Sequence, residues 1–571
     1  MNKKSFIILL ICSIMTGMLT GCKGSTDSTG ATVGTADVSD AGEALAQETA
    51  ANTHGEENNA QTVNGIDISE KVVFTASVAA QATNGNWNEY PFVKELEERY
   101  NVDIQFEQMS VDIWGEKYPL LFASDELPDF FCSGNIDTTT YGSQGYLLPL
   151  EKYISEELTP NIWKMMQETP TVKKASTEAD GHIYAIRGAD LSIQTRNQLY
   201  FFINSGWADK ILGKTPETLE EFYTYLKGVR DNDMDNDGSA SNEIPLGGYY
   251  KISNIDPMRA ILAACGHTMT DNYVEAQEDG KVVFVPAVDD YKFFLQYMNR
   301  LWSEGLMDPD YFTQDNAMFN AKDAAMLYGA FGNASHYMNH DRVEDYSQYA
   351  HLAPMTSEIN DRQIAPAVDC ALVGYFSITN KCENPERLLM VMDWFFSEEG
   401  INKCVYGWYK PGELEEFPEY GFTETETDAG IIHTFVGPAG ENDYPEGYDT
   451  LNDFRYAKLA PNFGCFPIYR NFTPPPSHAQ EAAKQQGVRD SCEPYFVDLF
   501  PNVIFTSEEK NEISLLYADL SAYVREMETK MIRGDVPIEA SWDSYKKGLM
   551  DRGVDRYIEL YQIAYDRWNN E

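Results

Sequence analysis

The stretch KVVFTASVAAQATNGNWNEYPFVKELEERYNVDIQFEQM, residues 71–109, decides the fold class. Residues 71–79 and 102–109 are rich in apolar and β-branched side chains and predict two strands. Residues 90–100 have the apolar spacing of an amphipathic helix. Because the helix stands between the strands, the strands are expected to pair in parallel within an α/β sheet.

Strand and helix signals continue beyond this stretch. Residues 127–134 and 198–204 predict further strands, and about the last hundred residues have mostly helical spacing. In KTPETLEEFYTYLKGV, Thr215 is the predicted N-cap and Pro216 lies in the first turn. Another helix is predicted to start at Asn384, and its apolar side consists of Leu388, Leu389, Met392, Phe395 and Phe396.

The N-terminus, MNKKSFIILLICSIMTGMLTGCKGS, has the layout of a secretory signal peptide. Two lysines precede an apolar run that ends near Leu19, too short for a membrane span. Residues 19–22 resemble the bacterial lipoprotein cleavage box, in which Cys22 becomes the lipidated first residue. Residues 1–21 are thus predicted to be removed, and acyl chains such as palmitate anchor Cys22 to the extracellular face of the cell membrane. The alternatives are an ordinary signal peptide and a buried N-terminal helix.

Residues 22–67 are predicted to form a disordered tether. This segment contains no aromatic residue and is built mainly from Ser, Thr, Gly, Ala, Asp, Glu and Asn. Such a composition buries too little apolar surface to offset the chain entropy lost on folding. The folded body is therefore expected to start near residue 68.

Charge and cysteine content narrow the classes of partner and environment. The 571-residue chain has 90 acidic and 43 basic residues, a net charge of −47, which disfavours binding to nucleic acid. The cysteines of the body show no C-x-x-C spacing, so buried thiols are expected, with one disulfide left open. These cysteines are Cys132, Cys265, Cys370, Cys382, Cys404, Cys465 and Cys492.

Motifs for catalysis are missing from the sequence, which contains no G-x-S-x-G, H-E-x-x-H, Walker or G-x-G-x-x-G pattern. We therefore assign no catalytic residue. His336 and His340 have a spacing that can hold a metal on one helix face, with Asp341, Asp345 or His351 nearby in sequence. The alternative is a pair of polar surface histidines.

A series of scaffold segments resembles the long extracellular solute-binding proteins of carbohydrate ABC importers. The resemblance extends from about residue 66 to about residue 568. In chain order, the segments are PFVKELEERYNVDIQF, ELPDFF, GYLLPLEKYI, GHIYAI, TPETLEEFYTYLKGV, NEIPLGG, LWSEGLMDPDYF, NPERLLMVMDWFFSEEG and YIELYQIAYDRW.

The resemblance implies a periplasmic-binding-protein-like α/β fold of type II, with two lobes, a hinge and a helical C-terminal part. Lobe one is expected at residues 68–198 and 365–412, and lobe two at residues 199–364 and 413–571. A monomer would close around an oligosaccharide or glycoside and deliver it to the transmembrane subunits of an ABC permease, with no catalysis.

Loops that follow strands are where ligand-binding residues converge in open α/β sheets. Sugar sites combine aromatic faces with polar side chains. Core packing or ordinary loop structure is the alternative at each candidate position. The candidates are Asn86, Trp87, Ser133, Tyr328, Phe331 and Trp408.

The segment DMDNDGSASNEIPL, residues 233–246, has the alternating carboxylates and glycine of an EF-hand-like calcium loop. Only one flanking helix is predicted, so the loop favours a structural calcium over a sensor. Some long members of the resembled family carry a calcium loop of this kind, and a metal-free acidic turn is the alternative. The predicted ligands are Asp233, Asp235, Asp237, Ser239, Asn242 and Glu243.

Two other functions remain open at this stage. A surface-anchored glycoside hydrolase or lyase would need a pair of cleft carboxylates, and the many acidic residues make accidental pairs unavoidable. A peptide or glycopeptide binder on the same scaffold is the other alternative.

Overall fold

The structure is a computed structural model that describes residues 62–250, 256–336, 347–427, 430–448, 450–461, 465–471 and 479–570. The predicted signal peptide, Cys22 and most of the predicted tether lie outside these residues. Residues 60–571 form one unit. Within the described chain, no helix is both long enough and apolar enough to cross a membrane.

The folded body starts earlier than predicted. Strands β1 (Thr62–Val63) and β2 (Ile66–Asp67) form an antiparallel hairpin inside the segment expected to be tether. Val63 and Ile66 pack against the core of the first lobe, which explains why this short segment is ordered.

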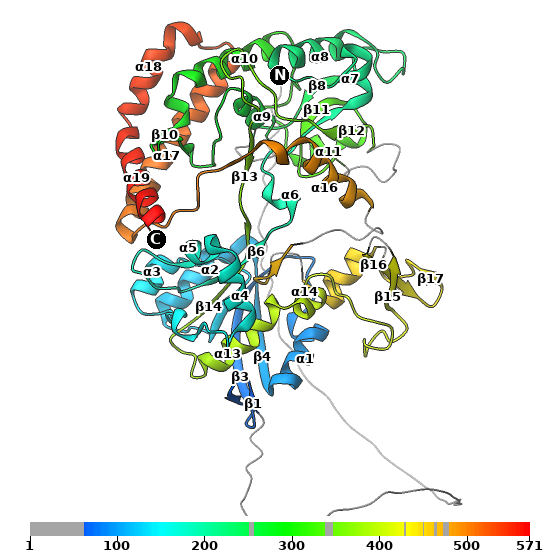
Figure 1. Ribbon diagram of the computed structural model, residues 1–571, viewed down its shortest axis with the longest axis vertical. Helices are drawn as coiled ribbons and strands as arrows, with labels where there is room; N and C mark the ends of the chain where they lie inside the picture. Colours follow the sequence, from blue (N-terminus) through cyan, green and yellow to red (C-terminus); the bar gives the residue numbers. More distant parts are fainter. Residues whose placement is uncertain are drawn as a thin grey trace, which may run out of the picture. The chain divides into compact units, whose positions relative to one another are not determined.

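Lobe one is built on a six-stranded mixed sheet (Figure 1). The predicted strands at residues 71–79, 102–109 and 127–134 are confirmed, and these three strands pair in parallel. In spatial order the strands are β18 (Tyr469–Arg470), β6 (Ile186–Asp190), β14 (Ala371–Ile378), β5 (Phe130–Cys132), β3 (Val72–Ala80) and β4 (Val102–Ser110).

The helices of lobe one bury apolar stripes against this sheet. The predicted helix between β3 and β4 is α1 (Pro91–Tyr100), which has Pro91 at its first position and buries Phe92, Val93 and Leu96. The other helices are α2 (Val111–Ser124), α3 (Thr138–Ser143), α4 (Pro160–Glu168), α5 (Pro170–Ser176), α13 (Pro385–Asp393), α14 (Glu398–Cys404) and α15 (Leu451–Phe454). An antiparallel sheet is added by β15 (Gly421–Thr427), β16 (Gly430–Gly437) and β17 (Gly440–Glu441).

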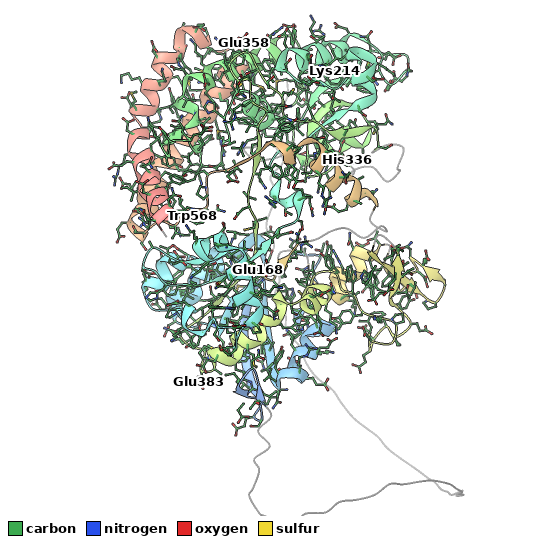
Figure 2. All side chains as sticks on the ribbon, viewed as in Figure 1. Glu168, Lys214, His336, Glu358, Glu383 and Trp568 are labelled. Carbon is green, nitrogen blue, oxygen red and sulfur yellow. The ribbon has the colours of Figure 1, made fainter. Side chains whose placement is uncertain are left out.

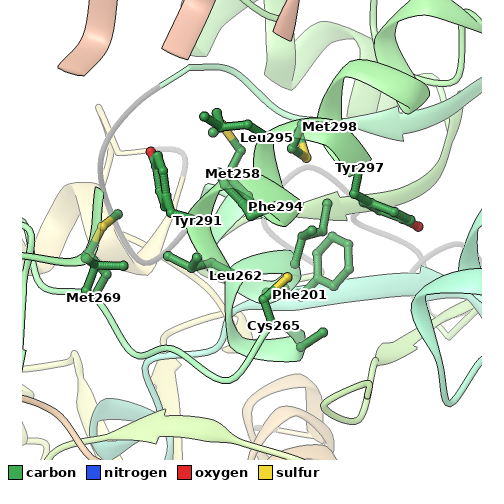
Figure 3. Close-up of a cluster of buried hydrophobic side chains, with 14 of the residues drawn as sticks. Phe201, Met258, Leu262, Cys265, Met269, Tyr291, Phe294, Leu295, Tyr297 and Met298 are labelled. Atoms are coloured by element: carbon green, nitrogen blue, oxygen red, sulfur yellow. The ribbon is translucent and has the colours of Figure 1, made fainter. Parts of the chain in front are cut away.

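Lobe two has its own four-stranded sheet, with helices packed around it. The strands, in spatial order, are β12 (Tyr349–His351), β7 (Phe201–Asn204), β11 (Tyr328–Gly332) and β8 (Ile244–Gly247). The helices before residue 330 are α7 (Ser205–Leu212), α8 (Leu219–Asp231), α9 (Pro257–Ala264), α10 (Asp289–Ser303) and α11 (Asn316–Ala324). A hairpin of β9 (Val274–Ala276) and β10 (Val282–Phe284) lies between α9 and α10 in the sequence. Figure 3 shows part of the core, where Phe201 lies near α9 and α10.

The C-terminal part is helical, as predicted. It consists of α16 (Ala479–Ser491), α17 (Ser507–Ile532), α18 (Ile538–Met550) and α19 (Val554–Asn570). Thr506 and Glu509 form a reciprocal capping box that starts α17, the longest of these helices. Leu520, Val524 and Tyr557 pack into the core of lobe two.

Three segments connect the lobes. The first contains α6 (Ile193–Arg196), and the second contains β13 (Ala365–Ala367), which pairs in parallel with β19 (Phe496–Asp498). The third lies between β18 in the sheet of lobe one and α16, which contacts β12 of lobe two. The expected two-lobe architecture is therefore confirmed.

The predicted boundary of lobe one at residue 412 is wrong. Strand β18 pairs with β6, and Phe466 packs with Trp87 and Phe395 in the lobe-one core. The second part of lobe one consequently extends to Arg470. No periodic pattern marks this extension, because β18 has only two residues.

The structure corrects the predicted start of α8 and agrees with the expectation for the cysteines. The helix N-cap is Thr218, not Thr215, because the Thr218 side chain accepts a hydrogen bond from the backbone N–H of Glu221. The seven cysteines from Cys132 to Cys492 are unpaired and buried, as expected.

Candidate functional site

A cavity of about 680 Å³ lies between the lobes, beside the connecting segments. Lobe one contributes Arg187 of β6 and Leu372 of β14, while lobe two contributes Arg259 of α9 and residues 269–272. Residues 499–505, which follow β19, line the side next to the connections. A relative rotation of the lobes would change the width of this cavity.

Most charged side chains of the lining already have partners. Arg259 forms an ion pair with Asp271 at 2.6 Å. His267 Nδ1 lies 2.7 Å from Glu275 Oε1, and both side chains are 9% exposed. Burial by itself lowers the pKa of His267, but the hydrogen bond and charge of Glu275 outweigh it, so the pKa is raised.

Arg187 differs from these groups because its guanidinium forms no ion pair with a carboxylate of the described residues. The guanidinium carbon lies 5.6 Å from the ring centroid of Tyr375, and the side chain is half-buried. Arg187 belongs to β6, which pairs with β14 on one side, with a register shift opposite Arg187, and with β18 at Ala189 and Asp190 on the other. This strand presents the cation to the cavity.

Aromatic side chains form the apolar part of the lining. Phe505 meets Tyr561 edge-on, with ring centroids 5.0 Å apart, and Phe500 meets the same tyrosine at 5.7 Å. Asn272 and Asn502 add amide groups. Aromatic faces combined with a few fixed polar groups suit a polar solute that also has apolar faces.

Two polar contacts join the lobes away from the connecting segments. Lys510 at the start of α17 forms an ion pair with Asp137, the N-cap of α3, at 2.6 Å. Lys174 of α5 donates a hydrogen bond of 2.8 Å to the carbonyl oxygen of Trp568 in α19. Figure 2 shows Trp568 at the end of lobe two that faces lobe one. These contacts restrain the separation of the lobes.

Three of the predicted ligand-binding residues are core residues, so those predictions are wrong. Trp87, Tyr328 and Phe331 are each 0% exposed. Trp87 packs on Phe106 and Phe466, whereas Tyr328 and Phe331 pack together inside lobe two. A position close to a strand end did not predict exposure, because tertiary packing covers these rings.

The other three candidates lie outside the described lining of the interlobe cavity. Asn86 is exposed and caps the 3₁₀ helix η1 (Trp87–Glu89), beside a separate depression of about 540 Å³ on lobe one. Ser133 Oγ donates to the carbonyl oxygen of Ala79 at 2.6 Å. Trp408 stacks on His433, with ring centroids 3.6 Å apart. Their ligand contacts remain predictions.

The cavity residues found here were missed at the sequence level. Arg187 had one detectable signal, a cation between Ile186 and Gly188 in a strand that is otherwise buried. Phe500 and Phe505 gave none, because their role depends on the packing of α19 against the preceding loop.

The histidine pair proposed as a metal site is only partly described, since His340 lies outside the described residues. His336 is buried, and its ring centroid lies 6.3 Å from that of His351. His351 is 6% exposed, and neither of its ring nitrogens has a hydrogen-bond partner among the described residues. Burial, together with the charges of His336 and Lys484, lowers the pKa of His351 to about 3.

The predicted calcium loop is a compact turn between α8 and β8. Asp233, Asp235 and Asp237 each accept a backbone hydrogen bond from within the loop, at 3.0, 2.9 and 2.8 Å. One carboxylate oxygen from each of Asp233, Asp235 and Glu243 lies within 4.8 Å of the others. Asn242 lies close to them, because its Nδ2 donates to Asp237 Oδ2 at 2.9 Å. The loop therefore gathers oxygen ligands of the type that calcium prefers.

The unpaired oxygens of this loop fit an ion. Asp233 Oδ1, Asn242 Oδ1 and Glu243 Oε2 are buried and have no hydrogen-bond partner among the described residues. Buried acceptors without a donor are costly, and a divalent cation would satisfy all three. By contrast, the side-chain hydroxyl of Ser239 is hydrogen-bonded to Ser241, which leaves its carbonyl oxygen as the predicted ligand.

No protein-family model matches the chain. The fructooligosaccharide ABC transporter substrate-binding protein FusA of Streptococcus pneumoniae is 23% identical over 499 residues, which cover 84% of this chain and 87% of FusA. An S. pneumoniae FusA EF-hand mutant in complex with fructo-nystose has a TM-score of 0.66 and 20% identity, covering 87% of this chain and 99% of that one.

The fold is also similar to that of an HMO-binding, ABC-transporter-associated solute-binding protein from Bifidobacterium longum infantis. Its TM-score is 0.71 with 18% identity, covering 87% of this chain and 99% of that chain. The two-lobed fold and the similarity to FusA along most of both chains agree with the motifs in the sequence. The chain is thus similar, along most of its length, to an extracellular solute-binding protein of the carbohydrate ABC transporter type.

Proposed function

We propose that this protein is the membrane-anchored solute-binding component of an ABC importer and captures an oligosaccharide or glycoside between its lobes. The observation that carries the proposal is the cavity of about 680 Å³ between two α/β lobes that are joined by three segments. FusA, which is similar along most of this chain, is a fructooligosaccharide-binding transporter component.

Binding requires no covalent chemistry in this scheme. A ligand that contacts both lobes stabilises the closed arrangement by its differential affinity for that arrangement, and the permease then recognises the closed form. Phe505, which packs on the buried Tyr561, supplies apolar surface, while Arg187 and Asn272 supply hydrogen-bond donors. The similarity to FusA, a substrate-binding protein, along most of this chain favours a binding protein over the hydrolase and lyase alternatives.

A glycan panel tests the proposal. The protein is expected to show a thermal upshift with at least one neutral or acidic oligosaccharide, without release of smaller sugars. Released product would support a hydrolase or lyase. If peptides stabilised the protein and no glycan did, the peptide-binding alternative would replace the proposal.

The attachment to the membrane is proposed from the sequence. Residues 19–22 resemble a lipoprotein cleavage box, so Cys22 is the proposed lipidation site on the extracellular face. The segment that follows would then give the folded body reach around the permease.

One structural calcium is proposed for the loop between α8 and β8. Asp233, Asp235, Asn242 and Glu243 would hold it with side-chain oxygens, together with Asp237 and the carbonyl oxygen of Ser239. The ion would supply the positive charge that gathers these acidic groups. The EF-hand named for the FusA mutant supports this proposal.

A further inference from the structure

We infer that Arg187 binds a carboxylate of the ligand, which makes an acidic oligosaccharide containing a uronic-acid residue the preferred cargo of the interlobe cavity. The inference rests on the proposed function and narrows it to one class of sugar. It follows from the charges that line the cavity and from the partners those charges have.

The side chain of Arg187 lacks a polar partner. Among the described residues, its guanidinium makes no hydrogen bond or ion pair and lies over the ring of Tyr375. The buried Glu178 is also near this tyrosine, but its oxygens accept hydrogen bonds from Thr138 and Thr139 at 2.5 and 2.9 Å. A half-buried guanidinium with several unused donors is costly unless an anion or other acceptor completes it.

The other basic side chains of the cavity lining have acidic partners. Arg259 pairs with Asp271, the one carboxylate in the described lining, and His267 pairs with Glu275. Arg187 is therefore the unpaired cation of the cavity as far as the structure describes it. This is notable in a chain with a net charge of −47, where carboxylates outnumber basic residues about two to one.

The guanidinium of Arg187 lies against an aromatic ring. Its position over Tyr375, which is 1% exposed, limits how the side chain can turn. A planar guanidinium held in this way can donate two parallel N–H bonds to one carboxylate. Sugar hydroxyls also accept from arginine, but a carboxylate adds the opposite charge and two acceptor oxygens that match the guanidinium fork.

The rest of the ligand would meet apolar surface in the same cavity. The partly exposed ring of Phe505, supported from behind by the buried Tyr561, offers the apolar surface that a pyranose ring requires. A small anion would leave this surface unused, whereas a uronic-acid oligosaccharide would use both the surface and the cation. The cavity volume of about 680 Å³ is in the range of sites for such ligands.

The test uses matched pairs of ligands on the full chain in detergent. Titration calorimetry would compare a panel of uronate oligosaccharides with their carboxyl-reduced counterparts, which differ only at C6 of each uronic residue. Trigalacturonate and α-1,4-galactotriose are the first pair. We expect at least one acid to bind about tenfold or more tightly than its reduced partner, with an affinity that falls as salt is added.

Substitutions identify the residue responsible. Arg187→Gln should weaken binding of the acid by about tenfold and change binding of the reduced sugar by less than about twofold. Arg187→Lys keeps the charge but not the two parallel donors, so its affinity for the acid should lie between those of wild type and Arg187→Gln. Arg362→Gln is the matched control, because Arg362 pairs with Glu278 on the surface and is 59% exposed. Thermal unfolding would confirm that each variant is folded.

The outcomes separate the inference from the proposed function. Reduced sugars that bind as tightly as the acids, or an Arg187→Gln variant that retains its preference for acids, would overturn the inference and leave the proposed function standing. Failure of every uronate and every reduced sugar to bind would also overturn the inference, whereas the proposed function fails only if no sugar of the wider glycan panel stabilises the protein.

Discussion

Acidification is expected to destabilise this protein through His351. The side chain is 6% exposed in the folded state, and its pKa is lowered from 6.5 to about 3. His351 therefore takes up a proton near pH 6.5 in the unfolded chain, but only near pH 3 in the folded chain. The stabilising contribution of neutral His351 is complete above pH 6.5 and is lost as the pH falls toward 3.

The magnitude follows from the separation of the two pKa values. Between pH 6.5 and about pH 5, the difference is about 1.5 units, which corresponds to about 2 kcal/mol at 1.36 kcal/mol per unit. The groups that face His351 are His336 on the segment after β11 and Lys484 on α16. Both disfavour a positive charge at His351, so neither rescues the protonated form.

The assay is chemical denaturation at about pH 7.5 and about pH 5, with wild type compared to His351→Leu. Leucine is chosen because neither ring nitrogen of His351 has a hydrogen-bond partner among the described residues. Wild type should lose about 2 kcal/mol more than the variant over this range. Equal losses in the two proteins would refute the reasoning.

His182, whose pKa is raised rather than lowered, provides the control. His182 is exposed and hydrogen-bonded to Glu151, which raises its pKa, so His182→Gln should not reduce the acid sensitivity. His267 also has a raised pKa, and it is unchanged in all three proteins, so its contribution cancels in the comparison.

Four further outcomes are expected. Calcium at about 100 times its Kd should stabilise the protein by about 2.7 kcal/mol, measured by thermal unfolding with and without chelator, and Glu243→Gln should reduce that gain. Lys510→Met should shift the ratio of closed to open lobes about two- to fivefold, because the ion pair with Asp137 is partly exposed and worth about 0.5–1 kcal/mol; fluorescence energy transfer between the lobes would detect this. Trp87→Ala should cost about 3–5 kcal/mol in denaturant unfolding while ligand affinity is unchanged, whereas a selective loss of affinity would restore the original ligand assignment. Cys22→Ser should abolish labelling by a radioactive fatty acid, and retained labelling would contradict the proposed anchor.

The strands and helices were predictable where local signals were strong. The β3–α1–β4 unit was recognisable because apolar periodicity, Pro91 and left-handed Asn101 agree over consecutive residues. By contrast, β18 was not predictable, because two residues carry no periodic pattern and its pairing with β6 depends on a distant part of the chain.

The site was harder to predict than the fold, for a physical reason. Trp87 and Tyr328 stand near strand ends and have the chemistry of sugar ligands, yet both are covered by residues distant in sequence. Arg187 lies within a strand rather than in the loop after it, so the rule that favours loops passed over it. Local chemistry was visible in the sequence, but exposure depends on tertiary packing.

The surroundings of the proposed calcium loop favour a structural ion over a calcium sensor. In a sensor EF-hand, the last carboxylate moves a second helix when the ion binds. Here Glu243 leads directly into β8, the last strand of its sheet, which pairs with β11 and forms a bridge from Leu246 to Met307. Glu243 is also buried, and its Oε1 already accepts a hydrogen bond of 2.6 Å from the backbone N–H of Met234. An ion between α8 and β8 would therefore tie the outer strand of lobe two to its helix without driving lobe closure, and the preference for a ligand would remain with the residues of the interlobe cavity.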